Sequence, residues 1–361
     1  MSDMTMRERM LAVIEGRPHD RVPFVQYSGI GAPNDEVWER IGRNNMGVLS
    51  WCGVHRFESP HCRFEQEETE IDGRPGTRRV LHTPAGSLTE ESLKAAISSA
   101  KCKHFVAEPD DYKVLLSYFR DITVHPHTER WKEAYEQLGD DGLPHTTIGR
   151  SPYQQLWVEW VNIQDLAMHM VDCPDLMEEV FAAMFDVQHG IIRAVCDVVR
   201  ELPVPYVTYA DNITAPIIGE PNFRRYCLPL YRDLADALAD TGKDVLVAVH
   251  MDGELRSLHD AIAESPVRLI DSFAPPPDND NPIDEARRLW PEMRLCLNFP
   301  SSVHLSERQV IYDTAMEILE QGGRAGRLQI QISENMPPDA WQKSYPEIVK
   351  AIRDFGGPVG G

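Results

Sequence analysis

The sequence has no long uninterrupted apolar run, and this absence excludes several kinds of protein. No stretch reaches the length of a membrane-spanning helix, and residues 1–20 mix charged with apolar residues. This pattern argues against a signal peptide and a transit peptide, so we expect a cytoplasmic protein without a membrane partner. The seven cysteines are scattered and include no C-x-x-C pair, which is typical of reduced thiols in a cytoplasm.

Positive charge is scarce. The chain has 36 Lys and Arg against 57 Asp and Glu, which gives a net charge of -21 at pH 7. A surface of this charge repels the phosphate backbone of nucleic acids and anionic membrane surfaces. We therefore expect no nucleic-acid partner. Small molecules and other proteins remain as partners.

Common nucleotide-binding and hydrolase motifs are missing. The sequence contains neither a G-x-x-x-x-G-K-[ST] loop nor a G-x-S-x-G nucleophile elbow. The segment GIGAPN, residues 29–34, has two glycines after an expected strand, but Pro33 and the lack of a third glycine spoil a dinucleotide fingerprint. Nucleotide hydrolysis and serine hydrolysis are therefore disfavoured.

Strands alternate with helices over most of the chain. Apolar runs predict strands at residues 22–27, near 47–52, and at 144–149, 205–211, 244–250, 267–273, 293–299 and 328–334. Helical periodicity predicts helices at 6–16, 109–119, 128–138, 174–201, 222–240, 254–264, 283–290 and 306–321. This alternation indicates a parallel α/β sheet, and the number of strands favours one closed (β/α)₈ TIM barrel spanning residues 1–361.

Two segments depart from the barrel pattern. Residues from about 60 to 90 alternate charged and apolar side chains around two glycine-containing turns, which predicts an antiparallel β-hairpin insertion with one solvated face. The glycine-rich end of the chain, residues 356–361, is expected to be flexible.

Polar side chains end most of the predicted strands. In a barrel, these ends meet at one rim, where the active site forms. His250 and Asp252 are two positions apart, so they project to the same side of an extended chain. With Glu334 from the last strand, they would form a three-ligand site for zinc or a similar divalent ion. A hydrogen-bonding role for His250 and a turn-capping role for Asp252 remain open.

Five further residues are candidates at the same rim. Asp211 and Asn212 would orient the substrate or supply general acid–base catalysis, alongside His250. Tyr27, Trp157 and Asn298 would line the substrate pocket. Trp157 belongs to the aromatic run SPYQQLWVEW, residues 151–160, and aromatic side chains at this spacing equally suit a packed core.

Several segments together resemble the uroporphyrinogen decarboxylase family. In chain order they are MRERMLAVIEGRPHDRVPF, RRVLHTPAGSL, DNITAPIIGEPNFRRYCLPLYRDLADAL, HMDGEL, DSFAPPP and LNFPSSV. The resemblance extends over nearly the whole chain. It implies a (β/α)₈ barrel with its active site at the carboxyl ends of the strands. Dimers are common in the family, so the resemblance also implies a homodimer.

The resemblance points away from true uroporphyrinogen decarboxylases. Those enzymes carry an arginine-rich segment after the first strand, whereas YSGIGAPNDEVWERIG has no arginine before Arg40. They also carry a histidine near the end of the last strand, where this chain has Glu334 in ISENMPP. A rim of carboxylates would repel a polyanionic porphyrinogen.

The methyltransferase branch of the family fits better. Its thiol-acceptor members have a His-x-Cys pair and a further Cys at places similar to those of His250, Asp252 and Glu334, so only the histidine is kept. Oxygen ligands in place of thiolates make a harder site and suggest an oxygen-containing substrate such as a methyl ether.

The resemblance therefore implies a metal-assisted methyltransferase that moves a methyl group from a small methylated or methoxylated compound to a corrinoid protein or related acceptor. A divalent metal, zinc by expectation, would act as a Lewis acid, and a partner protein would carry the corrinoid. Two alternatives remain. One is a decarboxylase of a small or tetrapyrrole-like carboxylic acid, in which Asp211 or His250 protonates a carbanion. The other is a non-catalytic ligand-binding barrel.

Overall fold

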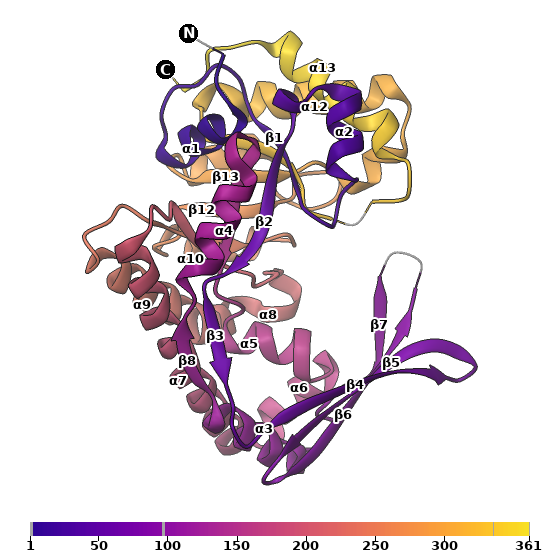
Figure 1. Cartoon of the computed structure of the whole chain (residues 1–361), viewed down its shortest axis with the longest axis vertical. Helices are drawn as coiled ribbons and strands as arrows, with labels where there is room; N and C mark the ends of the chain where they lie inside the picture. Colours follow the sequence, from indigo (N-terminus) through magenta and orange to yellow (C-terminus); the bar gives the residue numbers. More distant parts are fainter. Residues whose placement is uncertain (1–2, 96–97, 335, 361) are drawn as a thin grey trace.

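The eight predicted strands close into one parallel barrel (Figure 1). The computed structural model describes residues 3–95, 98–334 and 336–360. Around the barrel the order of strands is β1, β14, β13, β12, β11, β10, β9 and β2. Their bounds are β1 (Phe24–Tyr27), β2 (Gly47–Gly53), β9 (Gly142–Thr147), β10 (Tyr206–Tyr209), β11 (Leu246–His250), β12 (Leu269–Phe273), β13 (Arg294–Asn298) and β14 (Leu328–Ile332). The prediction of a TIM barrel is confirmed.

Helices pack on the outward-facing strand residues and bury the main hydrophobic core. The predicted helices at 128–138 and 174–201 have the expected bounds, and the others differ by a few residues. The helices are α1 (Met6–Glu15), α2 (Asn34–Ile41), α3 (Tyr112–Asp121), α4 (Thr128–Leu138), α5 (Pro152–Gln155), α6 (Ile163–Asp172), α7 (Pro174–Glu201), α8 (Ala215–Asn222), α9 (Leu228–Ala239), α10 (His259–Ala263), α11 (Ile283–Leu289), α12 (Arg308–Gly322) and α13 (Trp341–Phe355).

Helix α1 covers the amino-terminal end of the barrel. Its residues Met6, Met10 and Ile14 share a buried cluster with Leu49 and other interior-facing strand residues. Gly47 permits this approach, because a Cβ atom there would lie 2.5 Å from Cγ of Met6. The carboxyl ends of the strands lie at the opposite end of the barrel, where a TIM barrel forms its site.

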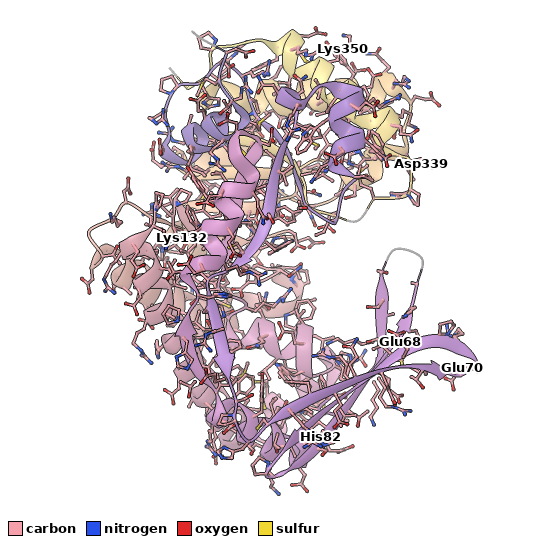
Figure 2. All side chains as sticks on the ribbon, in the orientation of Figure 1. Glu68, Glu70, His82, Lys132, Asp339 and Lys350 are labelled. Carbon is pink, nitrogen blue, oxygen red and sulfur yellow. The ribbon has the colours of Figure 1, made fainter. Side chains whose placement is uncertain are left out.

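The antiparallel insertion is longer than the predicted hairpin of about 60–90. It is a four-stranded sheet of β4 (Arg63–Ile71), β5 (Arg74–Thr83), β6 (Gly86–Lys94) and β7 (Ser99–Lys103). A separate pair, β3 (His55–Glu58) and β8 (Thr123–Pro126), flanks it in the chain. The prediction ended too early because the sequence between β6 and β7 has no glycine, proline or asparagine to signal a turn. The sheet projects from the barrel and carries polar side chains such as Glu68, Glu70 and His82 (Figures 1 and 2).

The carboxyl-terminal segment is held against the barrel, in contrast to the expectation of a flexible tail at 356–361. Val359 is buried and exchanges two backbone hydrogen bonds with His19, and the N–H of Gly360 donates to the carbonyl of Arg324. These contacts fix residues 356–360, whereas Gly361 lies outside the described residues. In the part of the chain that the structure describes, none of the helices combines the length and apolar character needed to cross a bilayer.

Candidate active site

The barrel interior changes from apolar to polar toward the carboxyl ends of the strands. Alternate residues of a strand face the interior. The deeper layer includes Val25, Leu49, Leu143, Tyr206, Ala248, Leu269 and Cys296. Two residues further along the same strands come Tyr27, Trp51, His145, Thr208, His250, Asp271 and Asn298, and β14 adds Gln331. The second layer therefore places hydrogen-bonding and aromatic side chains together at the mouth of the barrel.

Asp271 is the centre of this layer. Its Oδ2 accepts a hydrogen bond from the hydroxyl of Tyr27 and lies 2.9 Å from Nδ1 of His250. Its Oδ1 accepts a hydrogen bond of 2.9 Å from Nε2 of Gln331. Nε2 of His145 lies 3.5 Å from Oδ2. One buried carboxylate thus joins side chains from β1, β9, β11 and β14.

The charges of this cluster follow from its contacts. Burial acts to raise the pKa of Asp271, but His145 and His250 outweigh it and hold the pKa well below its usual range. Burial and the charge of Asp271 raise the pKa of Tyr27 well above its usual value. Asp271 is therefore an anion, and Tyr27 is a neutral hydrogen-bond donor to it.

His250 lies between two carboxylates. While Nδ1 faces Asp271, Nε2 lies 3.5 Å from Oδ2 of Asp252. Burial alone would lower the pKa of His250, but Asp252 and Asp271 raise it to about 10. Burial acts to raise the pKa of Asp252, and the stronger effect of His250 lowers it. With no other cation at Nε2, the imidazole is protonated at neutral pH.

Glu334 lies in the loop after β14, near enough to Asp252 and His250 for their charges to act on it. Burial raises its pKa, and the charge of Asp252 raises it further, while His250 acts in the opposite direction. Two carboxylates therefore act on each other beside one imidazole. Two carboxylates beside one imidazole favour the binding of a further positive charge.

The structure does not bring the three predicted metal ligands, His250, Asp252 and Glu334, together into a metal site. Within residues 3–95, 98–334 and 336–360, no group of three or more His, Cys, Asp and Glu side chains is arranged to hold a metal ion. The chemistry of the donors nevertheless fits. Two ligands of a tetrahedral zinc ion, each about 2.1 Å from it, are about 3.4 Å apart, and His250 Nε2 and Asp252 Oδ2 are separated by 3.5 Å. A histidine that binds a metal usually has its other ring nitrogen hydrogen-bonded to a group that orients the ring, and Asp271 contacts Nδ1 of His250 in this way.

Asn212 connects Asp252 to the guanidinium group of Arg150. Its Nδ2 donates a hydrogen bond of 3.1 Å to Oδ2 of Asp252, and its Oδ1 accepts one of 3.1 Å from Arg150. Asn212 has a φ of 53°, a left-handed conformation that few residues other than glycine adopt. The strained backbone thus aims the amide at Asp252.

Asp211 does not face this group. It is fully buried, and its carboxylate accepts hydrogen bonds from the N–H of Ser151 and the hydroxyl of Tyr231. Burial raises its pKa. Tyr209, two residues earlier, belongs to the core outside the barrel, so Asp211 points toward the helices. Its contacts hold the β9 and β10 loops together.

Trp157 and Asn298 stabilise loops beside the mouth. Trp157 is half-buried on a π-helical turn, Leu156–Trp160, and its indole N–H donates to the side chain of Gln154. Nε2 of Gln154 donates in turn to the backbone carbonyl of Asp211. Asn298 is buried, and its Oδ1 accepts hydrogen bonds of 3.0 Å from the backbone and the side chain of Ser333.

Sequence reasoning missed His145, Trp51 and Gln331, and it did not recognise Asp271 as the centre. The structure places this strand at Gly142–Thr147 rather than at the predicted 144–149. His145 therefore lies two residues from the carboxyl end of the strand instead of near its start. Counting two residues on from the apolar interior positions Leu49, Leu143 and Leu269 would have found Trp51, His145 and Asp271. Gln331 would have been missed, because Gln329 is the residue two positions before it. That count needs the strand bounds to within one residue.

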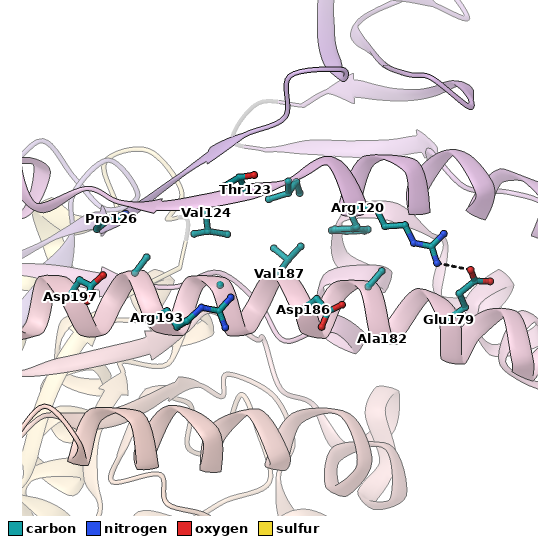
Figure 3. Close-up of a pocket in the computed structure, with 15 residues that line it drawn as sticks. Arg120, Thr123, Val124, Pro126, Glu179, Ala182, Asp186, Val187, Arg193 and Asp197 are labelled. Atoms are coloured by element: carbon teal, nitrogen blue, oxygen red, sulfur yellow. Dashed lines mark hydrogen bonds and ion pairs between the residues drawn. The ribbon is translucent and has the colours of Figure 1, made fainter.

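One cavity lies elsewhere, on the outside of the barrel (Figure 3). It has a volume of about 660 Å³ and lies between α7 and the segment from α3 to β8. Phe119, Val124 and Val187 form part of its apolar surface, and Arg120 pairs with Glu179 at one end. None of the predicted site residues lines it.

Comparison with known proteins agrees with the barrel. The sequence profile of the uroporphyrinogen decarboxylase (URO-D) family matches residues 158–355. The match spans more than half of the chain and includes the segments that carry Asn212, His250, Asp252, Asp271 and Glu334. The chain therefore belongs to the URO-D family.

Solved structures similar to this chain include two enzymes. A methyltransferase from Methanosarcina mazei has a TM-score of 0.56 and 13% identity, over 98% of this chain and 99% of that one. A B12-independent methionine synthase from Shewanella sp. W3-18-1, in complex with selenomethionine, has a TM-score of 0.41 and 9% identity, over 82% and 75%. The first supports the fold alone, and the second is too distant to support a conclusion. None of the curated proteins compared with the chain matches it.

Proposed function

We propose that this chain is a metal-assisted methyltransferase, which moves a methyl group from a small methylated or methoxylated compound to a corrinoid protein or a related acceptor. One observation carries the proposal: Nε2 of His250 faces Asp252 at 3.5 Å while Asp271 holds the other ring nitrogen. Glu334, in the loop after β14, would supply the third ligand. Membership of the URO-D family supports an enzyme at the strand ends.

The residues of the chain have distinct tasks in this proposal. A bound divalent ion would supply Lewis-acid polarisation of the leaving oxygen. His250, Asp252 and Glu334 would hold the ion. With an ion bound, Asp271 would accept a hydrogen bond from Nδ1–H of His250, which would leave the lone pair of Nε2 for the ion. The amide of Asn212 orients the carboxylate of Asp252.

The transfer itself is a displacement at the methyl carbon. The nucleophile of the acceptor forms the new bond to carbon while the C–O bond breaks, and both electrons of that bond stay on oxygen. The acceptor approaches from the open end of the barrel. A corrinoid protein is proposed as this partner, with the corrinoid bound to it.

Metal analysis and a transfer assay test the proposal together. The purified protein is dialysed against zinc and analysed for bound metal, then assayed for methyl transfer from methyl ethers to free cob(I)alamin. We expect one zinc per chain and zinc-dependent transfer, and we expect His250→Ala and Glu334→Gln to lose both. His189→Ala and Glu179→Gln change the same residue types on α7 and serve as controls. A protein that binds no zinc, or variants that bind it like the wild type, would contradict the proposal.

A decarboxylase is the second candidate, because one observation suits it. A buried imidazole between two carboxylates also suits an imidazolium that protonates a carbanion. Metal-independent release of carbon dioxide from a panel of small carboxylic acids, lost in His250→Gln, would favour it. Tight binding of a ligand without turnover would instead favour a non-catalytic ligand-binding barrel.

A further inference from the structure

Trp51 is exposed although its strand position faces the barrel interior. Leu49, two residues earlier on β2, belongs to the apolar interior layer. The next interior-facing residue is Trp51, which is 36% exposed, whereas its neighbours Tyr27 and His145 are each 1% exposed. A large aromatic side chain that faces the mouth of the barrel and stays accessible can contact a ligand there.

Two buried rings hold the indole in place. The ring centroid of Trp51 lies 5.0 Å from that of Tyr27 at an interplanar angle of 72°, and 4.8 Å from that of His145 at 80°. Both contacts are edge-to-face, a preferred arrangement of aromatic pairs. Because Tyr27 and His145 are fixed by Asp271, the indole is preorganised.

The same contacts join Trp51 to the proposed metal ligands. His145 lies opposite Trp51 in the β2–β9 register, and Asp271 links His145 to His250. A flat ring stacked on Trp51 would therefore lie at the same mouth of the barrel as the contact network that includes His250. An ether oxygen retains a lone pair for Lewis-acid activation, whereas a quaternary ammonium group, the other usual ligand of an exposed indole, has none.

We propose that Trp51 is the stacking surface for an aromatic ring of the substrate, and that the substrate class is a methoxylated arene. This inference rests on the proposed function, because it names the compound from which the methyl group is taken. Trp51 acts as a binding and specificity residue. It would select an aromatic ether over an aliphatic ether of equal size.

Binding to the zinc-free wild-type protein tests the inference apart from the chemistry. The probes are 1,2-dimethoxybenzene, methoxycyclohexane and tetramethylammonium, titrated with indole fluorescence and calorimetry as readouts. We expect the arene to bind most tightly and to quench fluorescence. In Trp51→Leu, arene binding should weaken about threefold to tenfold, as expected for the loss of one aromatic pair. Trp51→Phe should restore most of it.

The controls separate stacking from other effects. Phe57→Leu removes an exposed aromatic side chain on β3 and should bind the arene like the wild type. If Trp51→Leu does not fold, arene proton signals with the wild type provide a second readout, since a stacked indole shifts them upfield. Equal binding of the aliphatic ether, unchanged arene binding in Trp51→Leu, or preference for tetramethylammonium would each overturn the inference.

Failure of the inference and failure of the proposed function give different results. Zinc-dependent methyl transfer from aliphatic ethers, without a preference for arenes, would overturn the role of Trp51 and keep the methyltransferase. Arene binding that depends on Trp51, in a protein with no zinc and no transfer, would keep the stacking surface and overturn the methyltransferase.

Discussion

His250 and Asp271 lie directly opposite each other in the register of β11 and β12, and Nδ1 of the imidazole is 2.9 Å from Oδ2 of the carboxylate. Residues paired in adjacent parallel strands point to the same face of the sheet. The barrel register itself therefore builds this contact. A shift of β12 by one residue would turn Asp271 away from the interior and leave His250 without its support.

Replacing the Asp271 carboxylate by an amide is expected to destabilise the barrel. Asp271→Asn keeps the size of the side chain but removes the charge that Tyr27, His250 and Gln331 face. Removing one partner from a buried charged cluster costs about 3 kcal/mol or more of the free energy of unfolding. Chemical denaturation measures this cost. The matched change Asp186→Asn, at an exposed position on α7, should cost less than about 0.5 kcal/mol. Equal stability of the two variants would contradict the central role of Asp271.

The stability of the metal-free protein is expected to fall at alkaline pH. The pKa of His250 is raised from 6.5 to about 10 in the folded chain, so its contribution is complete below pH 6.5 and is lost as the pH rises to 10. A difference of this size corresponds to at most about 5 kcal/mol. Denaturation at several pH values should show the decline in the wild type and a flatter profile in His250→Gln. An equally steep decline in the wild type and in His250→Gln would show that other titratable groups cause it.

Two substitutions at Asn212 separate backbone strain from metal support. Both Asn212→Gly and Asn212→Ala remove the hydrogen bond to Asp252, so both should weaken zinc affinity about tenfold or more, as loss of a supporting contact does. Their stabilities should differ, because the φ of 53° suits glycine and costs alanine about 1 kcal/mol. Calorimetric zinc titration and thermal unfolding give the two readouts. Zinc affinity at the wild-type level in either variant would show that Asn212 does not support the proposed metal ligands.

The sequence predicts the barrel well because its strands are short apolar runs bounded by turns and helices. This signal depends only on local composition, and it locates all eight strands. It also places His250 and Asp252 side by side, since two positions along an extended chain share a face. Tyr27 and Asn298 reach the mouth for the same reason.

The rest of the site depends on strand bounds and on contacts between distant segments. Asp271 is central only because β11 and β12 pair in one particular register. Asp211 lies one residue from Asn212, yet it faces the helices while Asn212 faces Asp252. An error of one residue in a strand reverses such assignments. Strand β7 of the insertion was missed because no glycine, proline or asparagine separates it from β6 in the sequence.

X-ray absorption spectroscopy of the zinc-loaded protein tests the central claim most directly. Zinc bound to nitrogen and oxygen has ligands at about 2.0–2.1 Å, whereas a thiolate ligand lies at about 2.3 Å. We predict a shell of nitrogen and oxygen with one imidazole, and we predict that His250→Ala loses the imidazole signal. A sulfur ligand, or an imidazole signal that persists in His250→Ala, would contradict a metal site formed by His250, Asp252 and Glu334.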